Sequence, residues 1–459
     1  MKKRSLAKRI MAVMLCCLIS SMPVYAADTG LAPNVAPDMC NAGYWISMTP
    51  NPYDVIMTPE EIQAVNQRII NTPETHVKDL SEMEPSFNGT QLVAELASFK
   101  NPEGLYIAGQ PVPDWYYDYI RLNISTSRVS DKMNLQYGFV VNQTVMKGYP
   151  YNEYLSDSDW DMEWDNEAST GLNVNEPVVL YFYSGDGQFA YVESSFCSGW
   201  VPALDIAVCK DKAEWEKAQS YEKFLVVTGE KIYLEPSSAD PSLSEKKLLM
   251  GTVLPLADDK DGVISARLSW NNYVVLMPYR NADGSFAQKR ALIPANRDVH
   301  EGYLPYTTAN VLIQAFKSLG DRYGWGGMLY SNDCSGYMQN LYRCFGFKFA
   351  RNTTWQAAMP VPKLALDGFT PEQKGTLLGS GSIRPGSILQ FKGHEMMYLG
   401  SVNGKYYVIS NVSSLVASSE QDTNSEVIRP RSVVVNDLST RRASGVTWME
   451  ALNNVIIIG

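Results

Sequence analysis

Histidine and cysteine are scarce in this chain, which has 3 histidines and 7 cysteines in 459 residues. No two cysteines form a CxxC pair, so a zinc site made of thiolate clusters is not expected. The cysteines are also too few for a disulfide scaffold. No basic block follows the N-terminus and the net charge is −10, which argues against nucleic-acid binding through phosphate neutralisation.

The first 26 residues have the pattern of a signal peptide. A basic start precedes an apolar run, and Val24 and Ala26 fit the −3 and −1 positions of a cleavage site. The run is short for a membrane span, and a tilted anchor is the alternative. We expect residues 1–26 to be removed and the mature chain to be exported to the periplasm, the cell envelope or the medium.

Five cysteines remain after the leader, an odd number that leaves at least one thiol free or paired between molecules. Cys197 and Cys209 flank the stretch SGWVPALDIAV, and export would permit a bridge between them. Two separate thiols are the favoured interpretation.

The rest of the composition, 45% hydrophobic and 19% charged, suits a multidomain α+β protein with sizeable cores. The stretch TPEEIQAVNQRIINTP (58–73) predicts a capped helix, and residues 27–120 are expected to be mostly helical. Alternating runs around Gly-Asp-Gly and Asn-Ala-Asp-Gly turns predict small β units at 121–212 and 220–299. We expect an α+β domain over 300–459.

The run DSDWDMEWDNE (157–167) is strongly acidic. A calcium loop starting at Asp157 would need glycine at its sixth position and glutamate at its twelfth, where the chain has Met162 and Ala168. A solvated loop, with the option of facing a substrate, is the preferred interpretation, and no metal site is expected.

One cysteine stands out by its surroundings. Cys334 follows the glycine-rich, aromatic stretch DRYGWGGMLYSND, and apolar residues recur after it at helical spacing as far as Phe345. This pattern predicts that Cys334 lies near a helix N-terminus, where unpaired N–H groups and the helix dipole favour a nucleophilic thiolate. The alternative is an ordinary buried thiol.

A nucleophile needs a base, and the chain offers only His76, His300 and His394. His394 begins a predicted strand, and a meander after the cysteine helix would bring it back to the N-terminus of that helix. Ser410 and Asn411, on the next predicted strand, are both candidates for the residue that orients the imidazole.

Five motifs of this region resemble those of the NlpC-type cell-wall cysteine peptidases: YGWGG (323–327), DCSGY (333–337), RNTTWQ (351–356), RPGSILQF (384–391) and GHEMMYLG (393–400). The resemblance covers about residues 300–459 and implies a papain-like α+β domain. The upstream plan resembles multidomain members that have a helical N-terminal clip and two bacterial SH3-like β-barrels. In such members the first barrel closes one end of the substrate groove.

The resemblance implies an endopeptidase that cuts peptidoglycan stem peptides between γ-D-glutamate and the diamino acid. Cys334 would be the nucleophile and His394 the general base, without a cofactor. Stem peptides would be the partners, with no nucleic acid and no obligate protein partner.

The resemblance also implies roles for four residues around the nucleophile. Asp333 and Ser335 would hold the free amine of an N-terminal L-alanine. Tyr323 would line the site and help to stabilise the oxyanion, and the hydroxyl of Thr353 would contact the substrate.

One position departs from the family. Its third catalytic residue is usually a histidine on the strand after the Gly-His strand, where this chain has Ser410, or Asn411 if the alignment shifts by one. Because serine orients an imidazole less well, a weakly active or non-catalytic wall-binding protein is the main alternative. An acyltransferase with the same papain-like site is a third hypothesis.

Overall fold

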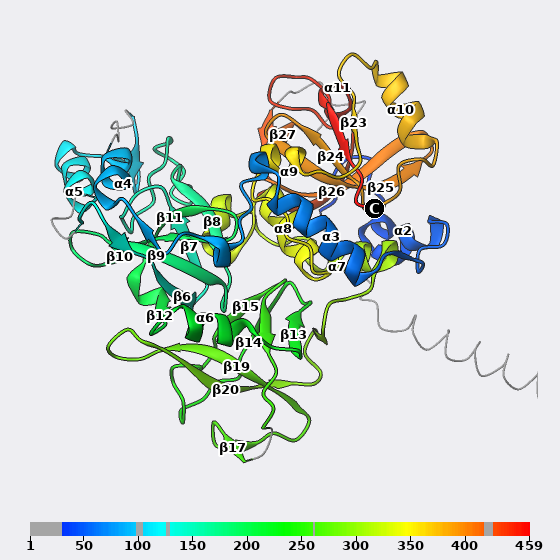
Figure 1. Ribbon diagram of the computed structural model, residues 1–459. Helices are drawn as coiled ribbons and strands as arrows, with labels where there is room; N and C mark the ends of the chain where they lie inside the picture. Colours follow the sequence, from blue (N-terminus) through cyan, green and yellow to red (C-terminus); the bar gives the residue numbers. More distant parts are fainter. Residues whose placement is uncertain (1–29, 98–103, 125–128, 260–261, 417–425) are drawn as a thin grey trace, which may run out of the picture.

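The computed structural model describes residues 30–97, 104–124, 129–259, 262–416 and 426–459. The predicted signal peptide lies outside these residues. The chain passes through an N-terminal segment, a first β unit, a second β unit and a C-terminal domain (Figure 1). No helix in the described ranges is both long and apolar enough to cross a membrane.

In its described residues the N-terminal segment contains the α-helices α2 (Ala42–Met48), α3 (Pro59–Ile70), α4 (Gly89–Leu96) and α5 (Asp114–Ile124), with short 3₁₀ turns and strands between them. The helix predicted at 58–73 is α3, and Thr58 and Glu61 form a reciprocal capping box at its start. The boundary expected at residue 120 falls inside α5.

The segment is divided between two neighbours. Its first half packs on the C-terminal domain, where the ring of the fully buried Trp45 lies 5.5 Å from that of Tyr407. Its second half packs on the first β unit, where Ile120 and Ile124 of α5 join a core that includes Trp200. The segment therefore ties the two parts together.

The first β unit is a seven-stranded antiparallel sheet with the order β12-β6-β9-β10-β11-β7-β8. Its strands are β6 (Gln136–Val140), β7 (Thr144–Lys147), β8 (Ala168–Leu172), β9 (Pro177–Tyr183), β10 (Phe189–Glu193), β11 (Ser198–Pro202) and β12 (Ile206–Val208). The predicted Gly-Asp-Gly hairpin joins β9 to β10. Helix α6 (Lys212–Gln219) leads to the second unit.

The second β unit consists of short antiparallel pairings and one long hairpin. Its strands are β13 (Phe224–Val227), β14 (Lys231–Tyr233), β15 (Lys247–Leu249), β16 (Val253–Pro255), β17 (Val263–Ile264), β18 (Arg267–Leu268), β19 (Asn272–Arg280), β20 (Phe286–Pro294) and β21 (Val299–Glu301). The predicted Asn-Ala-Asp-Gly turn joins β19 to β20, and Gly284 has the positive φ of 89° that this turn needs.

The C-terminal domain is built on a six-stranded sheet with the order β23-β30-β24-β25-β26-β29. These strands are β23 (Lys363–Ala365), β24 (Ile388–Phe391), β25 (His394–Val402), β26 (Lys405–Val412), β29 (Ser432–Asp437) and β30 (Asn454–Ile456). The helices are α7 (Thr308–Lys317), α8 (Cys334–Arg343), α9 (Thr353–Ala358), α10 (Pro371–Gly379) and α11 (Trp448–Ala451).

Strand alternation divides the core of this domain into two layers. Met397 of β25 packs with Leu341 of α8 in one apolar cluster, whereas the preceding residue, Met396, packs with Leu378 of α10 in another. The sheet therefore lies between α8 and α10, and β25 carries side chains to both faces.

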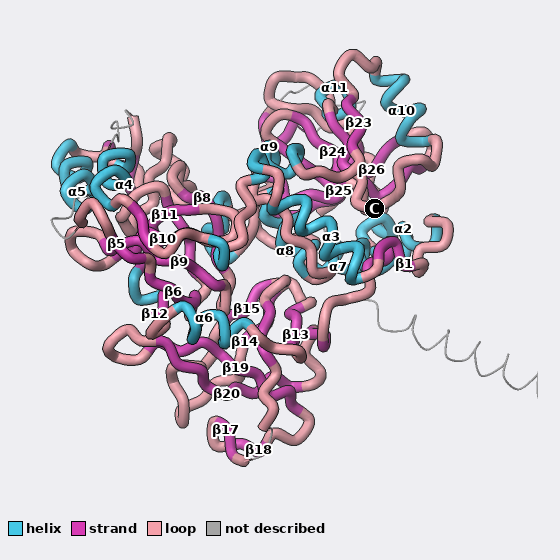
Figure 2. Tube along the Cα trace, in the orientation of Figure 1, coloured by secondary structure: helices cyan, strands magenta, loops and turns pink. Residues whose placement is uncertain are grey.

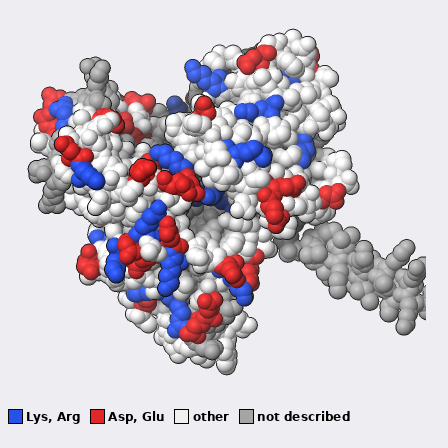
Figure 3. Space-filling view, viewed as in Figure 1, with Lys and Arg blue, Asp and Glu red and all other residues white. Residues whose placement is uncertain are grey.

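The helices gather in the C-terminal domain and at the far edge of the first β unit, whereas strands dominate the second β unit (Figure 2). On the face drawn in Figure 3, acidic and basic side chains lie close together where the parts of the molecule meet.

Candidate active site

Cys334 is the first residue of α8, and Asp333 caps this helix by accepting a hydrogen bond from the Gly336 N–H at 2.7 Å. The thiol lies against the start of β25, where the backbone N–H of Glu395 forms a hydrogen bond with the sulfur. This hydrogen bond by itself favours the thiolate over the thiol. Burial nevertheless raises the pKa of Cys334, and the charges of Asp333 and Glu395 add to this effect. In contrast to the expected resting thiolate, the surroundings favour a protonated thiol, so a base has to remove the proton.

Asp333 is surrounded by donors of the protein itself. Arg351 forms two hydrogen bonds with its carboxylate, at 3.1 and 2.7 Å, and the Gly326 N–H and Ser335 hydroxyl donate to it at 3.0 and 3.2 Å. Burial alone would raise the pKa of Asp333, but the Arg351 guanidinium and the backbone donors outweigh it and hold the pKa below its usual value. Asp333 is thus a charged helix cap whose carboxylate oxygens already accept hydrogen bonds from the protein. Its binding of a substrate amine stays a prediction.

Arg351 links this cap to the first β unit. Its Nε donates to the hydroxyl of Thr170, in β8, at 2.7 Å, and its Nη1 donates to Ser335 at 3.1 Å. The motif RNTTWQ was noticed in the sequence, but nothing local indicated that its arginine reaches a residue 181 positions earlier.

His394 begins β25, and its Nε2 lies 3.1 Å from the hydroxyl oxygen of Ser410 in β26. Within the described residues its Nδ1 has no hydrogen-bond partner. Burial, with the positive charge of Arg442 second, lowers the pKa of His394 to about 3. The imidazole is therefore neutral at physiological pH, as a general base must be.

Of the two candidates for the third position, the structure brings only Ser410 to the imidazole. Asn411 faces the other side of the sheet, where its Nδ2 donates to the carbonyl of Asn332 at 2.7 Å. It supports the loop that precedes the cysteine helix rather than the base.

A cleft of about 320 Å³ opens beside His394 and is lined by Trp164, Tyr323, Trp325, Phe391, Lys392, Gly393, His394, Val412, Ser413, Ser414, Arg442, Ala443 and Trp448. Tyr323 is the one predicted substrate-contact residue in this lining. Ser335 is buried behind Arg351, and Thr353 is half-buried at the start of α9, where its carbonyl accepts a hydrogen bond from Gln390.

Trp164 reaches this cleft from the first β unit. Its ring stacks on that of Trp325, with centroids 4.9 Å apart and planes 25° apart, and lies parallel to that of Tyr323 at 6.4 Å. The next residue, Asp165, anchors the loop through a buried ion pair of 2.9 Å with Lys147. Trp164 was missed in the sequence, although a tryptophan within an acidic run was a usable signal.

The acidic run is a largely exposed loop, as expected, and it uses the option of facing the cleft; its residues Asp161 and Asp165 are buried. Asp161 forms a bidentate ion pair with Arg431, and Glu163 pairs with Arg322 at 2.6 Å. Both arginines belong to the C-terminal domain, so the acidic side chains fix Trp164 against the cleft.

The glycines of YGWGG make room for this contact. Gly326 and Gly327 have positive φ values of 56° and 83°. A Cβ atom on Gly327 would lie 2.2 Å from the backbone nitrogen of Gly171 in β8, a distance that no side chain tolerates. The turn therefore packs directly on the first β unit.

Tyr323 has a hydroxyl without a hydrogen-bond partner in the described part of the chain. Burial raises the pKa of this phenol well above its ordinary value, and the nearby Cys334 and Asp333 add to the effect. It is a neutral donor close to the nucleophile.

Glu395 is an unexpected carboxyl group at this site. It is fully buried, its Oε2 accepts a hydrogen bond from Gln390 at 2.7 Å, and its Oε1 has no hydrogen-bond partner among the residues that the structure describes. Burial raises the pKa of Glu395 to about 8, so this side chain is protonated and neutral at pH 7.

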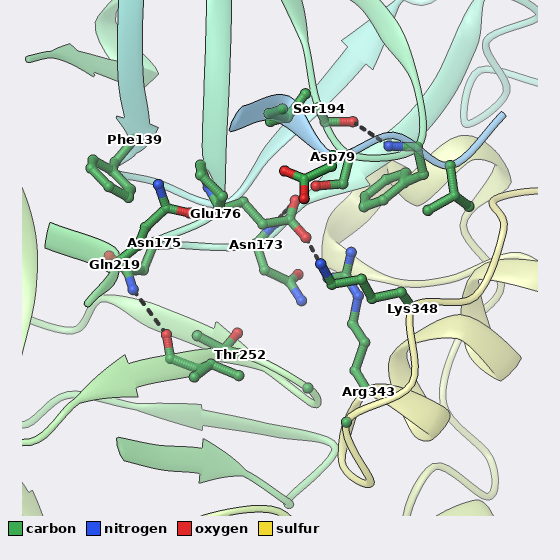
Figure 4. Close-up of a pocket in the computed structure, with 18 of the residues that line it drawn as sticks. Asp79, Phe139, Asn173, Asn175, Glu176, Ser194, Gln219, Thr252, Arg343 and Lys348 are labelled. Atoms are coloured by element: carbon green, nitrogen blue, oxygen red, sulfur yellow. Dashed lines mark hydrogen bonds and ion pairs between the residues drawn. The ribbon is translucent and has the colours of Figure 1, made fainter. Parts of the chain in front are cut away.

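A second cavity, of about 470 Å³, lies between the two β units and the C-terminal domain (Figure 4). Neither Cys334 nor His394 lines it. Glu176 and Arg343 form an ion pair across its wall, and Lys78 pairs with Glu193 at 2.8 Å. Cys334 lines neither space, but His394 and Tyr323 both line the first cleft, so the cleft beside His394 is the better candidate for catalysis.

All five cysteines of the described residues are free thiols. Cys209 is buried and Cys197 is half-buried, and no disulfide joins them, in agreement with the favoured interpretation.

Two regions of the chain match known protein families. Residues 320–431 match the NlpC/P60 family, and residues 154–202 match the family described as SH3 domain (SH3b1 type). The chain carries a C-terminal NlpC/P60 domain. An SH3-type domain precedes it, so Trp164 is the contribution of this SH3-type domain to the cleft.

One solved structure has a similar overall architecture. A structure described as a novel NlpC/P60 endopeptidase from Photobacterium damselae subsp. piscicida is 19% identical, covers 91% of this chain and 96% of that chain, and has a TM-score of 0.70. At this identity the likeness concerns the fold. An NlpC/P60 family protein from Bacillus cereus ATCC 10987 is 17% identical over 70% of this chain and 99% of that chain, with a TM-score of 0.45. No curated protein matches the sequence significantly.

Proposed function

We propose that this protein is an exported endopeptidase that hydrolyses the bond between γ-D-glutamate and the diamino acid of peptidoglycan stem peptides. The observation that carries the proposal is the position of Cys334, at the N-terminus of α8 and against the start of the strand that begins with His394. The NlpC/P60 domain, a cysteine peptidase fold, supports this assignment.

The reaction follows from these groups. The neutral His394 takes the thiol proton of Cys334 as the sulfur attacks the carbonyl carbon of the scissile bond. His394 then gives the proton to the leaving amine of the diamino acid, and a thioester to Cys334 remains. Water attacks the thioester, which releases the carboxylate product and restores the thiol.

The oxyanion formed in each attack lies where donors are available. The first N–H groups of α8 lack helical partners, and the neutral hydroxyl of Tyr323 is free to donate. Such fixed donors in a partly dry site stabilise the developing charge. The presence of both Cys334 and His394 favours catalysis over a purely wall-binding role, and Ser410 holds the imidazole of His394 through a hydrogen bond to its Nε2.

The cleft favours short substrates. Trp164 packs on Tyr323 and Trp325 and covers the end of the cleft that these three rings line. A peptide that ends there with a free L-alanine therefore fits better than one that continues into the glycan. The products of the proposed reaction are therefore the dipeptide L-alanyl-D-glutamate and a peptide that begins with the diamino acid.

The test uses the mature chain and a synthetic stem tripeptide, with product masses as the readout. Native protein should release L-alanyl-D-glutamate. Cys334→Ala should abolish the reaction and His394→Ala should nearly do so, with unchanged near-UV circular dichroism. Substantial turnover by either variant, or cleavage at another bond, would contradict the proposal.

A further inference from the structure

The cleft beside His394 is cationic on one side, although the whole chain has a net charge of −10. Lys392 and Arg442 belong to its lining, and no acidic residue does in the part of the chain that the structure describes. The exposed Lys392 stands at the rim, and Arg442 is half-buried.

Arg442 is held in place without an acidic partner. Its guanidinium carbon lies 4.9 Å from the ring centre of Phe391, and its Nη2 donates to the carbonyl oxygen of Lys392 at 3.2 Å. No carboxylate pairs with it among the described residues, whereas Arg351, Arg322 and Arg431 each have one. Its remaining donors are available to a ligand.

This guanidinium is close to the general base. The rings of Phe391 and Trp448 lie 5.4 and 5.0 Å from the ring of His394, and the two rings lie 5.5 Å from each other. Ser410 forms a hydrogen bond with the Nε2 of the imidazole, and, in addition to burial, the positive charge of Arg442 is near enough to lower the pKa of His394. A substrate group bound by Arg442 would therefore lie near the scissile bond.

We propose that Arg442 binds a carboxylate of the stem peptide beside the scissile bond and makes the enzyme select peptides that carry it. The inference rests on the proposed function and adds a specificity residue to it. When the diamino acid is followed by D-alanine, two carboxylates are close to that bond: the α-carboxylate of the γ-linked D-glutamate and the side-chain carboxylate of a diamino acid such as diaminopimelate. Guanidinium and carboxylate groups match in geometry, and their charge-assisted hydrogen bonds are strong in a partly dry cleft.

Binding of this carboxylate also changes the base. In the free enzyme the positive charge of Arg442 opposes protonation of His394. A bound carboxylate neutralises that charge, so the pKa of His394 is higher in the enzyme–substrate complex than in the free enzyme. The acidic limb of kcat, which reports the complex, should lie at higher pH than that of kcat/KM, which reports the free enzyme.

The experiment compares three tetrapeptides in which the α-carboxyl of the diamino acid is amide-linked to D-alanine: L-alanyl-γ-D-glutamyl-meso-diaminopimelyl-D-alanine, its analogue with D-isoglutamine in place of D-glutamate, and its analogue with L-lysine in place of diaminopimelate. Native enzyme should cut the first peptide faster than the analogue that lacks the recognised carboxylate. The analogue that is cut more slowly therefore shows which of the two carboxylates Arg442 binds. Arg442→Gln should lower kcat/KM for the first peptide about 10- to 100-fold and abolish the preference. Arg442→Lys should retain part of it.

Arg441→Gln is the matched control, because the neighbouring arginine donates to the carbonyl of Gly445 at 2.6 Å and does not line the cleft. It should leave rates and preferences unchanged. Equal loss on all three peptides in Arg442→Gln, or acidic limbs that coincide in native enzyme, would assign Arg442 a structural role and overturn the inference. Equal rates of native enzyme on all three peptides would overturn it without any variant. If none of the peptides is cut, the proposed function itself fails.

Discussion

Trp164 and Trp325 stack face to face across the junction of the first β unit and the C-terminal domain, with ring centroids 4.9 Å apart. One belongs to the SH3-type domain and the other to the YGWGG turn of the NlpC/P60 domain. The stack makes the upstream domain part of the candidate catalytic cleft, so removal of one ring should change the rate of turnover.

Trp164→Ala should lower kcat/KM on a stem tripeptide about 3- to 10-fold, the equivalent of one aromatic contact of about 0.5–1.5 kcal/mol. It should also weaken discrimination against peptides that continue beyond the L-alanine, because that end of the cleft opens. Trp115→Ala is the control, since this ring is 67% exposed on α5. Unchanged kinetics in Trp164→Ala would show that the stack is structural only.

Ser410 and Asn411 should separate catalysis from stability. Ser410→Ala removes the partner of His394 Nε2 and should lower kcat about 3- to 10-fold, the worth of one hydrogen bond, with Tm unchanged. Asn411→Ala removes the support of the Asn332 carbonyl and should lower Tm instead. Thermal melts and steady-state rates of both variants test this, and the reverse pattern would make Asn411 the orienting residue.

Local sequence patterns predicted those parts of the site that depend on helix caps, apolar spacing and turns. The helix that begins at Cys334 follows from its cap and apolar spacing, and the strand that begins at His394 follows from the turns around it. Register decided between Ser410 and Asn411, because one step along a strand reverses the face. The sequence alone did not define that register.

Contacts between distant parts of the chain were beyond such patterns. Arg351 reaches Thr170 and Trp164 reaches Trp325, and in each pair the partners are far apart in the sequence. The helix dipole at Cys334 was correctly placed but outweighed by burial, which depends on the packing of the whole domain. Glu395 lies within the motif GHEMMYLG, but nothing in that motif indicated a role for it, and Arg442 lies outside the five motifs.

Glu395 should make the stability of the protein depend on pH. Its pKa is raised from 4.5 to about 8 by folding, so between these values the folded state holds a proton that the unfolded state releases. Stability is therefore fully present below pH 4.5 and falls as pH rises to 8, by up to about 1.4 kcal/mol per pH unit. Glu395→Gln keeps the shape without the charge and should flatten this slope.

Urea unfolding between pH 5 and 9 measures the effect. Glu372→Gln is a suitable control, because this carboxyl is exposed on α10. The reactivity of Cys334 with iodoacetamide at pH 9 should also be higher in Glu395→Gln than in native protein, since no negative charge then opposes the thiolate. Equal pH slopes in native protein and Glu395→Gln would show that Glu395 is ionised in the folded state.

The last prediction concerns the substrate amine. If Asp333 and Ser335 hold the ammonium group of L-alanine, acetylation of that amine should cost about 2–3 kcal/mol in kcat/KM. The structure makes this a demanding test, because the carboxylate of Asp333 already accepts hydrogen bonds from Arg351, Gly326, Gly336 and Ser335. An incoming ammonium group would have to share these oxygens.

Native enzyme should therefore be compared on free and acetylated tripeptides before any variant is made. Asp333→Asn is a poor first choice, since it leaves Arg351 buried without its counter-charge and should destabilise the protein by about 3–5 kcal/mol. Ser335→Ala removes one contact without a buried charge, and it should reduce discrimination between the two peptides if the amine lies there. Equal kcat/KM values of native enzyme on both peptides would mean that Asp333 acts only by capping α8 and pairing with Arg351, and that the preference for short peptides comes from the aromatic wall at Trp164.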